Sequence, residues 1–519
     1  MKLKTICIFA ITIFTVAVAV RLAAHGRPRS MGKDQLRYRL VDIGTFGGPT
    51  SGNNGESTVM NNQGDVAGFA DTTAADPFAP FCLTDCFVVH SFEWRNGALI
   101  DLRALPGGGS SETNAINSQQ QVVGFSENGV INPLNGIPEL AATVWHDGRV
   151  IDLGTFGGNF SLASMNNDHQ QVVGCASNDV PDPFTATGVL YGLLFDANQL
   201  RAFRWEGKKL HDLGTLGGPD ACAVWINEHG QVTGASFTNS IANADTGVPT
   251  IDPFLWDNGK MIDVGTLGGT VGFGFIVNNR GQLIGISSLA EAPGACITAP
   301  GSGTPGCHGI LWERGKLTDL GTLGGDFSIA NWINDEGEIV GVASTTDELT
   351  VHGARWKNGV ITDLGPLTGD CASQAFAINS QGLIAGQSFP CDASPPRAVI
   401  WESDGTVHDL NALVQPGSGL ELTDPKIIND AGAIVLEGFL SNGDQHSVVL
   451  IPCETGEDGC MDSNESATIA APHSSATVGN SPSTVAQTRP TPSANVAAWR
   501  TRMARRYCIP ILGVATAKH

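Results

Sequence analysis

Histidine recurs at one position of this sequence, and imidazole is the side chain best suited to acid–base chemistry near neutral pH. Four copies lie four residues before a tryptophan or its equivalent: His90, His308, His352 and His446. The same position holds Arg201, Asp252 or Arg397 in other copies. A histidine chemistry shared by all copies is therefore not expected.

Signatures of known catalytic chemistry are missing from the sequence. It has no G-x-S-x-G elbow, no H-E-x-x-H pair and no Walker loop, and the Gly-Thr-Leu-Gly-Gly-Thr segment at 265–270 is part of a repeat. Residues 243–245 and 454–465 make calcium conceivable, but neither follows the twelve-residue EF-hand pattern. We therefore assign no catalytic, cofactor-binding or metal-ligating residue. The cofactor stays unknown, with calcium a weak candidate.

Twelve cysteines point to disulfide chemistry. A metal site is disfavoured, since no C-x-x-C pair and no zinc-like His/Cys spacing occurs. Close spacing predicts disulfides in an oxidising compartment for Cys82 with Cys86, Cys296 with Cys307, and Cys453 with Cys460. Position in the repeat suggests two further pairs, Cys371 with Cys391 and Cys175 with Cys222. Cys508 is left without a partner.

The N-terminus reads as an export signal. Lys2 and Lys4 precede an uncharged apolar run, and small residues follow it, so residues 1–24 are predicted to be a signal peptide, with an uncleaved N-terminal anchor as the alternative. The net charge is −22, and residues 41–465 carry 15 Lys/Arg against 50 Asp/Glu. A body this acidic excludes nucleic acid as a partner and would attract cations or basic partners.

Three markers recur in the same order along the chain. The first is Asp-Leu-Gly-Thr-Leu/Phe-Gly-Gly, with its aspartate at Asp42, Asp101, Asp152, Asp212, Asp263, Asp319, Asp363 and Asp409. A tryptophan precedes each copy after the first, at Trp94, Trp145, Trp205, Trp256, Trp312, Trp356 and Trp401. The third marker resembles Ile-Asn-x-x-Gly-Gln-Val-Val-Gly, with asparagines at Asn61, Asn117, Asn167, Asn227, Asn278, Asn334, Asn379 and Asn429. A repeating architecture follows.

Each unit is predicted to hold four short strands, a to d. Strand a ends at the asparagine, strand c ends at the tryptophan, and Asn-Gly or Asp-Gly pairs such as Asn96-Gly97 predict a tight c–d hairpin. This favours an all-β β-propeller of about eight four-stranded blades over a solenoid. The strand at 38–45 is a lone strand d, and we expect it to complete the last blade and close the ring. Seven blades with a stray strand is the alternative.

These motifs, together with Arg-Ala-Phe-x-Trp at Arg201–Trp205, resemble those of bacterial extracellular HAF-repeat proteins. The resemblance covers residues 38–451, so we expect a HAF-repeat propeller domain at 36–451. The motif that names the family departs from its pattern in several copies, including His90–Phe92 and His352–Ala354. The resemblance implies an exported, extracellular or cell-surface location and a repeat fold. It implies no reaction and no ligand.

Length variation is concentrated in one connection. The distance from the tryptophan to the next asparagine is 22 or 23 residues in six cases, whereas the b–c connection varies widely and is longest in the first five blades. In an antiparallel four-stranded blade, the b–c and d–a connections emerge on one face. Variable loops on a constant scaffold are where binding sites usually lie, and the four predicted disulfides within the repeats are expected on this b–c face.

The sequence therefore favours a non-enzymatic binding or scaffold module that contacts a glycan, peptide or protein through its b–c loops. The alternative is a hydrolase or lyase, metal-assisted or not, with a site over the central channel. Unrepeated acids or histidines that converge at the channel mouth would favour the enzyme. A purely structural role in the envelope is a third interpretation.

The C-terminal part, 452–519, departs from the repeat. It begins with the acidic loop between Cys453 and Cys460, continues with a Ser/Thr/Pro-rich linker at 466–498, and ends in a basic segment at 497–507. That segment could form a short amphipathic helix that contacts the anionic cell envelope, with a disordered tail as the alternative.

Overall fold

The computed structural model describes residues 36–453, apart from 55–57, 79–81, 83–85, 134–135, 183, 185–197, 298–304, 348–349 and 393, together with 468–469. The predicted signal peptide, the loop after Cys453, the linker apart from 468–469 and the basic segment thus lie outside the described residues. Within the described part, no helix has the length and hydrophobicity needed to span a bilayer.

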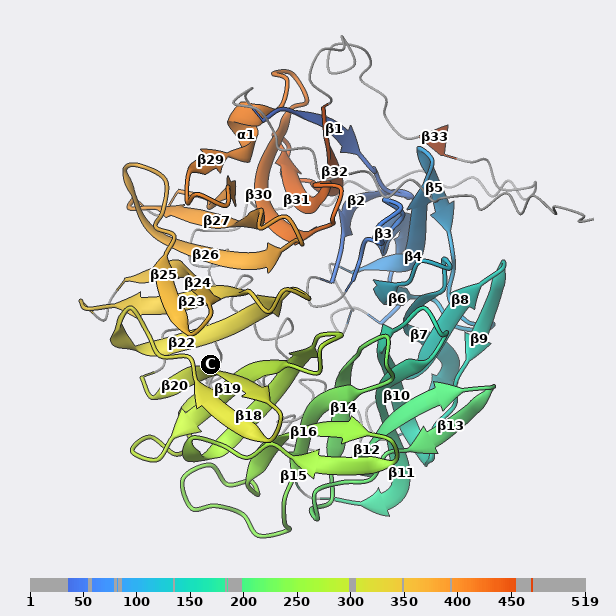
Figure 1. Ribbon diagram of the computed structural model, residues 1–519. Helices are drawn as coiled ribbons and strands as arrows, with labels where there is room; N and C mark the ends of the chain where they lie inside the picture. Colours follow the sequence, from blue (N-terminus) through green and yellow to red (C-terminus); the bar gives the residue numbers. More distant parts are fainter. Residues whose placement is uncertain are drawn as a thin grey trace, which may run out of the picture. The chain divides into compact units, whose positions relative to one another are not determined.

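The described strands pair into antiparallel groups of four, which we call blades 1 to 8 in chain order (Figure 1). Blade 1 contains β2 (Gly47–Gly52), β3 (Val66–Ala75), β4 (Phe87–Arg95) and β5 (Ala98–Asp101). Blade 2 contains β6 (Ser111–Ile116), β7 (Val122–Ile131), β8 (Pro138–His146) and β9 (Arg149–Asp152). Blade 3 contains β10 (Gly157–Asn166), β11 (Val172–Pro181), β12 (Asn198–Glu206) and β13 (Lys209–Asp212). Blade 4 contains β14 (Ala221–Ile226), β15 (Val232–Phe237), β16 (Ile251–Asp257) and β17 (Lys260–Asp263).

The remaining blades follow the same order. Blade 5 contains β18 (Gly268–Val277), β19 (Leu283–Leu289), β20 (Cys307–Glu313) and β21 (Lys316–Asp319), with the 3₁₀ helix η2 (Ala295–Ile297) in its b–c loop. Blade 6 contains β22 (Gly324–Ile333), β23 (Ile339–Thr345), β24 (Val351–Lys357) and β25 (Val360–Asp363). Blade 7 contains β26 (Asp370–Ile378), β27 (Ile384–Pro390), β28 (Arg397–Trp401) and β29 (Val407–Asp409), followed by α1 (Leu410–Leu413). Blade 8 contains β30 (Leu420–Ile428), β31 (Ile434–Leu440), β32 (Gln445–Pro452) and β1 (Tyr38–Asp42), and a short β33 (Thr468–Ile469) pairs with β5.

Local sequence explains two features of a blade, the c–d turn and the close approach of strands a and b. Asn96 and Gly97 both have positive φ, 51° and 77°, as the predicted c–d turn requires. In strand b the glycine of the repeat meets the backbone of strand a. A Cβ on Gly234 would lie 2.0 Å from the Cys222 carbonyl oxygen, so no larger residue fits there without a shift.

Two contacts close the ring. The N-terminal strand β1 lies antiparallel to β32, with Leu40 opposite Leu450, as the repeat predicts (Figure 1). The asparagine of each third marker donates its Nδ2–H to the main-chain oxygen of the equivalent asparagine in the next blade, and Asn429 donates in the same way to Asn61 at 3.3 Å. A solenoid would leave both ends open, so the all-β propeller class is confirmed.

Side chains fill the middle of the ring. Trp225 of β14 and Trp332 of β22 meet edge to face, with ring centroids 5.4 Å apart. Trp332 also packs against the hydrophobic clusters of blades 7, 8 and 1. These two indoles therefore occupy the centre of the ring at this level.

Candidate functional site

The repeated aspartates and tryptophans hold the scaffold together. Each motif aspartate accepts a hydrogen bond from the backbone N–H two residues later, at 2.7–2.9 Å. The Trp145, Trp356 and Trp401 indoles donate to a main-chain oxygen just after strand d of the preceding blade. These tryptophans therefore link neighbouring blades.

The structure brings together two positions that the sequence analysis treated separately. The side chain four residues before the tryptophan meets the motif aspartate of the same unit across the c–d hairpin. The pairs, at 2.9–3.1 Å, are His90 with Asp101, Arg201 with Asp212, His308 with Asp319, His352 with Asp363, and His446 with Asp42. Within the chain the two positions are always eleven residues apart, which is the signal that could have found them, except that His446 joins the separate strand β1.

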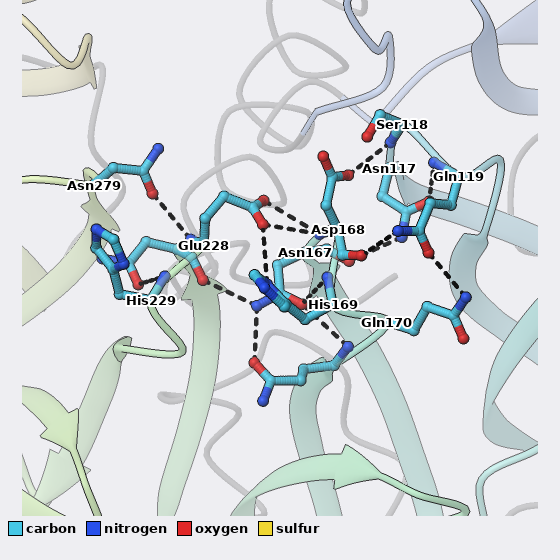
Figure 2. A network of polar contacts seen from close by, with 12 residues as sticks. Asn117, Ser118, Gln119, Asn167, Asp168, His169, Gln170, Glu228, His229 and Asn279 are labelled. Carbon is cyan, nitrogen blue, oxygen red and sulfur yellow. Dashed lines mark hydrogen bonds and ion pairs between the residues drawn. The ribbon is translucent and has the colours of Figure 1, made fainter. Parts of the chain in front are cut away.

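Acids and histidines converge at the a–b turns around the ring centre (Figure 2). The Asp168 carboxylate accepts from the Ser118 N–H, and the Glu228 carboxylate accepts from the Asp168 N–H at 3.1 and 3.2 Å. His169 Nδ1 lies 3.4 Å from Glu228 Oε2. Burial raises the pKa of Glu228, against the opposing effect of the Asp168 amide. These carboxylates already accept hydrogen bonds from backbone N–H groups of the preceding blade. Their geometry therefore indicates that they link neighbouring blades.

A shallow cavity of about 380 Å³ lies on this same side, between blades 3 and 4. Arg204 lies over the Trp256 ring, 4.8 Å from its centroid, and pairs with Glu206 at 3.0 Å. His229 completes the polar part of its lining. The cavity is on the face opposite the variable b–c connections.

Buried polar side chains replace apolar ones in blades 7 and 8. The cross-strand pair that is Phe273–Ile286 in blade 5 becomes Gln374–Gln387 in blade 7 and Asp424–Glu437 in blade 8. Lys426 Nζ lies 2.8 Å from Asp424 and 3.2 Å from Glu437. The Oε1 atoms of Gln374 and Gln387 are buried without a hydrogen-bond partner among the described residues. At 2% exposure neither glutamine is within reach of a ligand, so the cluster belongs to the core.

The b–c connections of blades 1 to 3 differ from the expected long loops. Strand b is ten residues long in β3, β7 and β11, against seven in β23 and β27. After an irregularity in the ladder the pairing resumes, for example between Ile131 and Pro138. Part of the extra length therefore extends the hairpin beyond the body of the blade.

Aliphatic side chains project from three consecutive blades at this face. Val130 and Val180 lie at the same position of the two strand extensions. Ile241 occupies the corresponding place of an asparagine turn in the blade 4 loop, one residue further from the glycine of strand b; the three are 53%, 45% and 77% exposed. An asparagine two residues earlier accepts a hydrogen bond from each of their N–H groups, at 2.7–2.9 Å. With Ile131, 47% exposed, we call these residues the apolar tips. Among the described residues, the other large hydrophobic side chain of comparable exposure is Val360, on a c–d turn.

Disulfides fasten part of the same face. Cys82–Cys86 and Cys296–Cys307 close b–c loops, and Cys371–Cys391 joins the ends of strands a and b. The prediction that every pair lies on this face is wrong for Cys175–Cys222. Both residues are at most 1% exposed and lie between blades 3 and 4, because β11 continues six residues past Cys175 to Pro181.

Comparisons with known proteins find structural similarity at low sequence identity. No protein-family model and no curated sequence matches the chain. Among solved structures, the β-propeller domain of the Trilobed protease from Pyrococcus furiosus, described as having an open velcro topology, is 10% identical, with a TM-score of 0.40 over 67% of this chain and 94% of that one. Porphyromonas gingivalis dipeptidyl peptidase 4 is 8% identical, with a TM-score of 0.39 over 76% of this chain and 59% of that one. TolB from Acinetobacter baumannii is 11% identical, with a TM-score of 0.29 over 62% and 77%.

Proposed function

We propose that this protein is an exported, non-enzymatic binding module that binds a peptide or protein segment through its b–c face. The observation that carries the proposal is the set of apolar tips at equivalent positions of blades 2, 3 and 4. Exposed aliphatic groups gathered in one region are typical of protein-binding surfaces. Burying one such side chain contributes about 1.5–3 kcal/mol, enough for three of them to dominate a small interface.

The chemistry of the tips favours a polypeptide over a glycan. Aliphatic side chains offer no hydrogen bonds to sugar hydroxyls, whereas they fit aliphatic or aromatic residues of a protein. Asp179 is exposed beside Val180, and the surrounding body is strongly acidic. The expected ligand therefore combines apolar residues with lysine or arginine.

The oxidising location is supported by the disulfides among the described residues. Loops that are closed by a disulfide lose less conformational entropy when a ligand binds than loops without one. The resemblance to extracellular HAF-repeat proteins points the same way. We therefore place the binding event outside the cytoplasm.

Selection of a displayed peptide library on the full chain, followed by affinity measurement, tests the proposal. The triple variant Val130→Ser, Val180→Ser, Ile241→Ser should bind the selected peptides at least tenfold more weakly, since tenfold corresponds to only about 1.4 kcal/mol. Val360→Ser is the matched control, because it removes an equally exposed aliphatic group from the other face. Unchanged affinity in the triple variant, or an equal loss in the control, would show that the proposed face is wrong.

A further inference from the structure

Blade 4 breaks the charge pattern of the outer hairpins. In five units a histidine or arginine faces the motif aspartate across strands c and d. In blade 4 that position is Asp252, which faces Asp263. Two carboxyl groups thus meet where those five units place an imidazole or guanidinium group beside one carboxylate.

The pair is not neutralised by the contacts that stabilise its equivalents. Asp252 is only 9% exposed, and its Oδ1 has no hydrogen-bond partner among the described residues. Asp263 Oδ1 accepts from the Gly265 N–H at 2.8 Å, as every motif aspartate does from its own turn. A buried carboxylate without a counter-charge is unfavourable, so this position needs a cation or a proton.

We propose that Asp252 and Asp263 form a binding site for a divalent cation, of the calcium class, between strands c and d of blade 4. Carboxylate oxygens are the preferred ligands of calcium, and water completes its shell where protein ligands are few. Asp263 is exposed, whereas the Asp252 Oδ1 atom is buried. The ion takes the place that His308 or His352 fills in its own blade.

The site also lies at the C-terminal end of the long b–c connection of blade 4. Asp252 is the second residue of β16, which begins where the 238–250 segment carrying Ile241 ends. A bound ion would join the start of β16 to the end of β17. The proposal stands independently of what the apolar tips bind.

Calcium titration of the full chain at pH 7.5, followed by calorimetry and by terbium luminescence excited through tryptophan, tests the site. The natural protein should bind one more equivalent of calcium than Asp252→Asn. Asp252→His, which recreates the pair of the other blades, should also lose this equivalent while keeping its melting temperature without calcium. Asp152→Asn is the control, because Asp152 is the motif aspartate of a unit in which Ala141 stands at the sequence position of Asp252, and it should leave binding unchanged.

Equal calcium stoichiometry in the natural protein and Asp252→Asn would overturn the proposal. So would a natural protein that gains stability on acidification yet shows no calcium response at this site, because the pair would then hold only a shared proton. Loss of the equivalent in the Asp152→Asn control would overturn it as well, since the binding would then not be specific to blade 4.

Discussion

The scaffold and the b–c face of this propeller are built on opposite principles. In the scaffold the same contacts recur from blade to blade: asparagine to the next main-chain oxygen, and carboxylate to the neighbouring N–H (Figure 2). On the b–c face the lengths change, disulfides fasten individual loops, and the apolar tips stand exposed. Polar groups that recur at the same position of successive blades can thus have a structural role. The exposed apolar tips, by contrast, mark the surface that we propose binds a ligand.

Disulfides should show the largest difference between the two regions. Replacing Cys175 and Cys222 by alanine opens a link of sequence separation 47 in the scaffold, which costs about 4 kcal/mol in the chain-entropy model. Replacing Cys82 and Cys86 opens a separation of only 4, which costs about 2 kcal/mol and acts on one loop. Urea unfolding of both double variants measures this. Equal losses would contradict a scaffold that depends on contacts between blades.

Asparagine substitutions should give the next largest difference in stability between the scaffold and the b–c face. Asn227 Oδ1 accepts from two backbone N–H groups, and its Nδ2 bridges to Asn278 at 2.8 Å in a buried position. Asn227→Ala should cost about 2–4 kcal/mol, because several buried groups lose a partner. Asn239→Ala removes one turn bond below Ile241 and should cost about 1 kcal/mol or less. Thermal unfolding of the two variants compares them directly, and a greater loss for Asn239→Ala would reverse the roles of the two regions.

The third contrast concerns the pH dependence of stability on the b–c side. Since the folded pKa of Asp252 is raised to about 7, above the ordinary value of 3.8, the folded state holds its proton more tightly than the unfolded state. Stability from this group is full below pH 4 and is lost as the pH rises from about 4 to 7. In the presence of a calcium chelator, Asp252→Asn should therefore be less sensitive to this rise than the natural protein. Identical stability–pH curves would refute the carboxyl pairing.

Much of the scaffold could be predicted from sequence because it is repeated. The motif aspartates, the tryptophans, the c–d turns and the closing strand β1 follow from spacing and turn chemistry alone. The buried Lys426 cluster could not be found in this way, since it replaces apolar residues in only two blades and its members lie on different strands. The burial of Cys175–Cys222 was missed because the length of β11 depends on pairing with β12 and not on the local motif.

The apolar tips were also hidden in the sequence. Val130, Val180 and Ile241 lie in segments that differ in length and composition, and only the turn geometry reveals their equivalence. What the sequence did indicate was the face, because length variation in the b–c connections was readable without a structure. The identity of the contact residues required the three-dimensional arrangement.

Hydrogen exchange of the full chain with and without a selected peptide tests the central claim most directly. If the b–c face binds, the peptide should protect backbone amides in 128–132, 178–182 and 239–243, with no change in the a–b turns at 168–170 and 228–230. Protection of those a–b turns, with the apolar tips exchanging as in the free protein, would contradict the account.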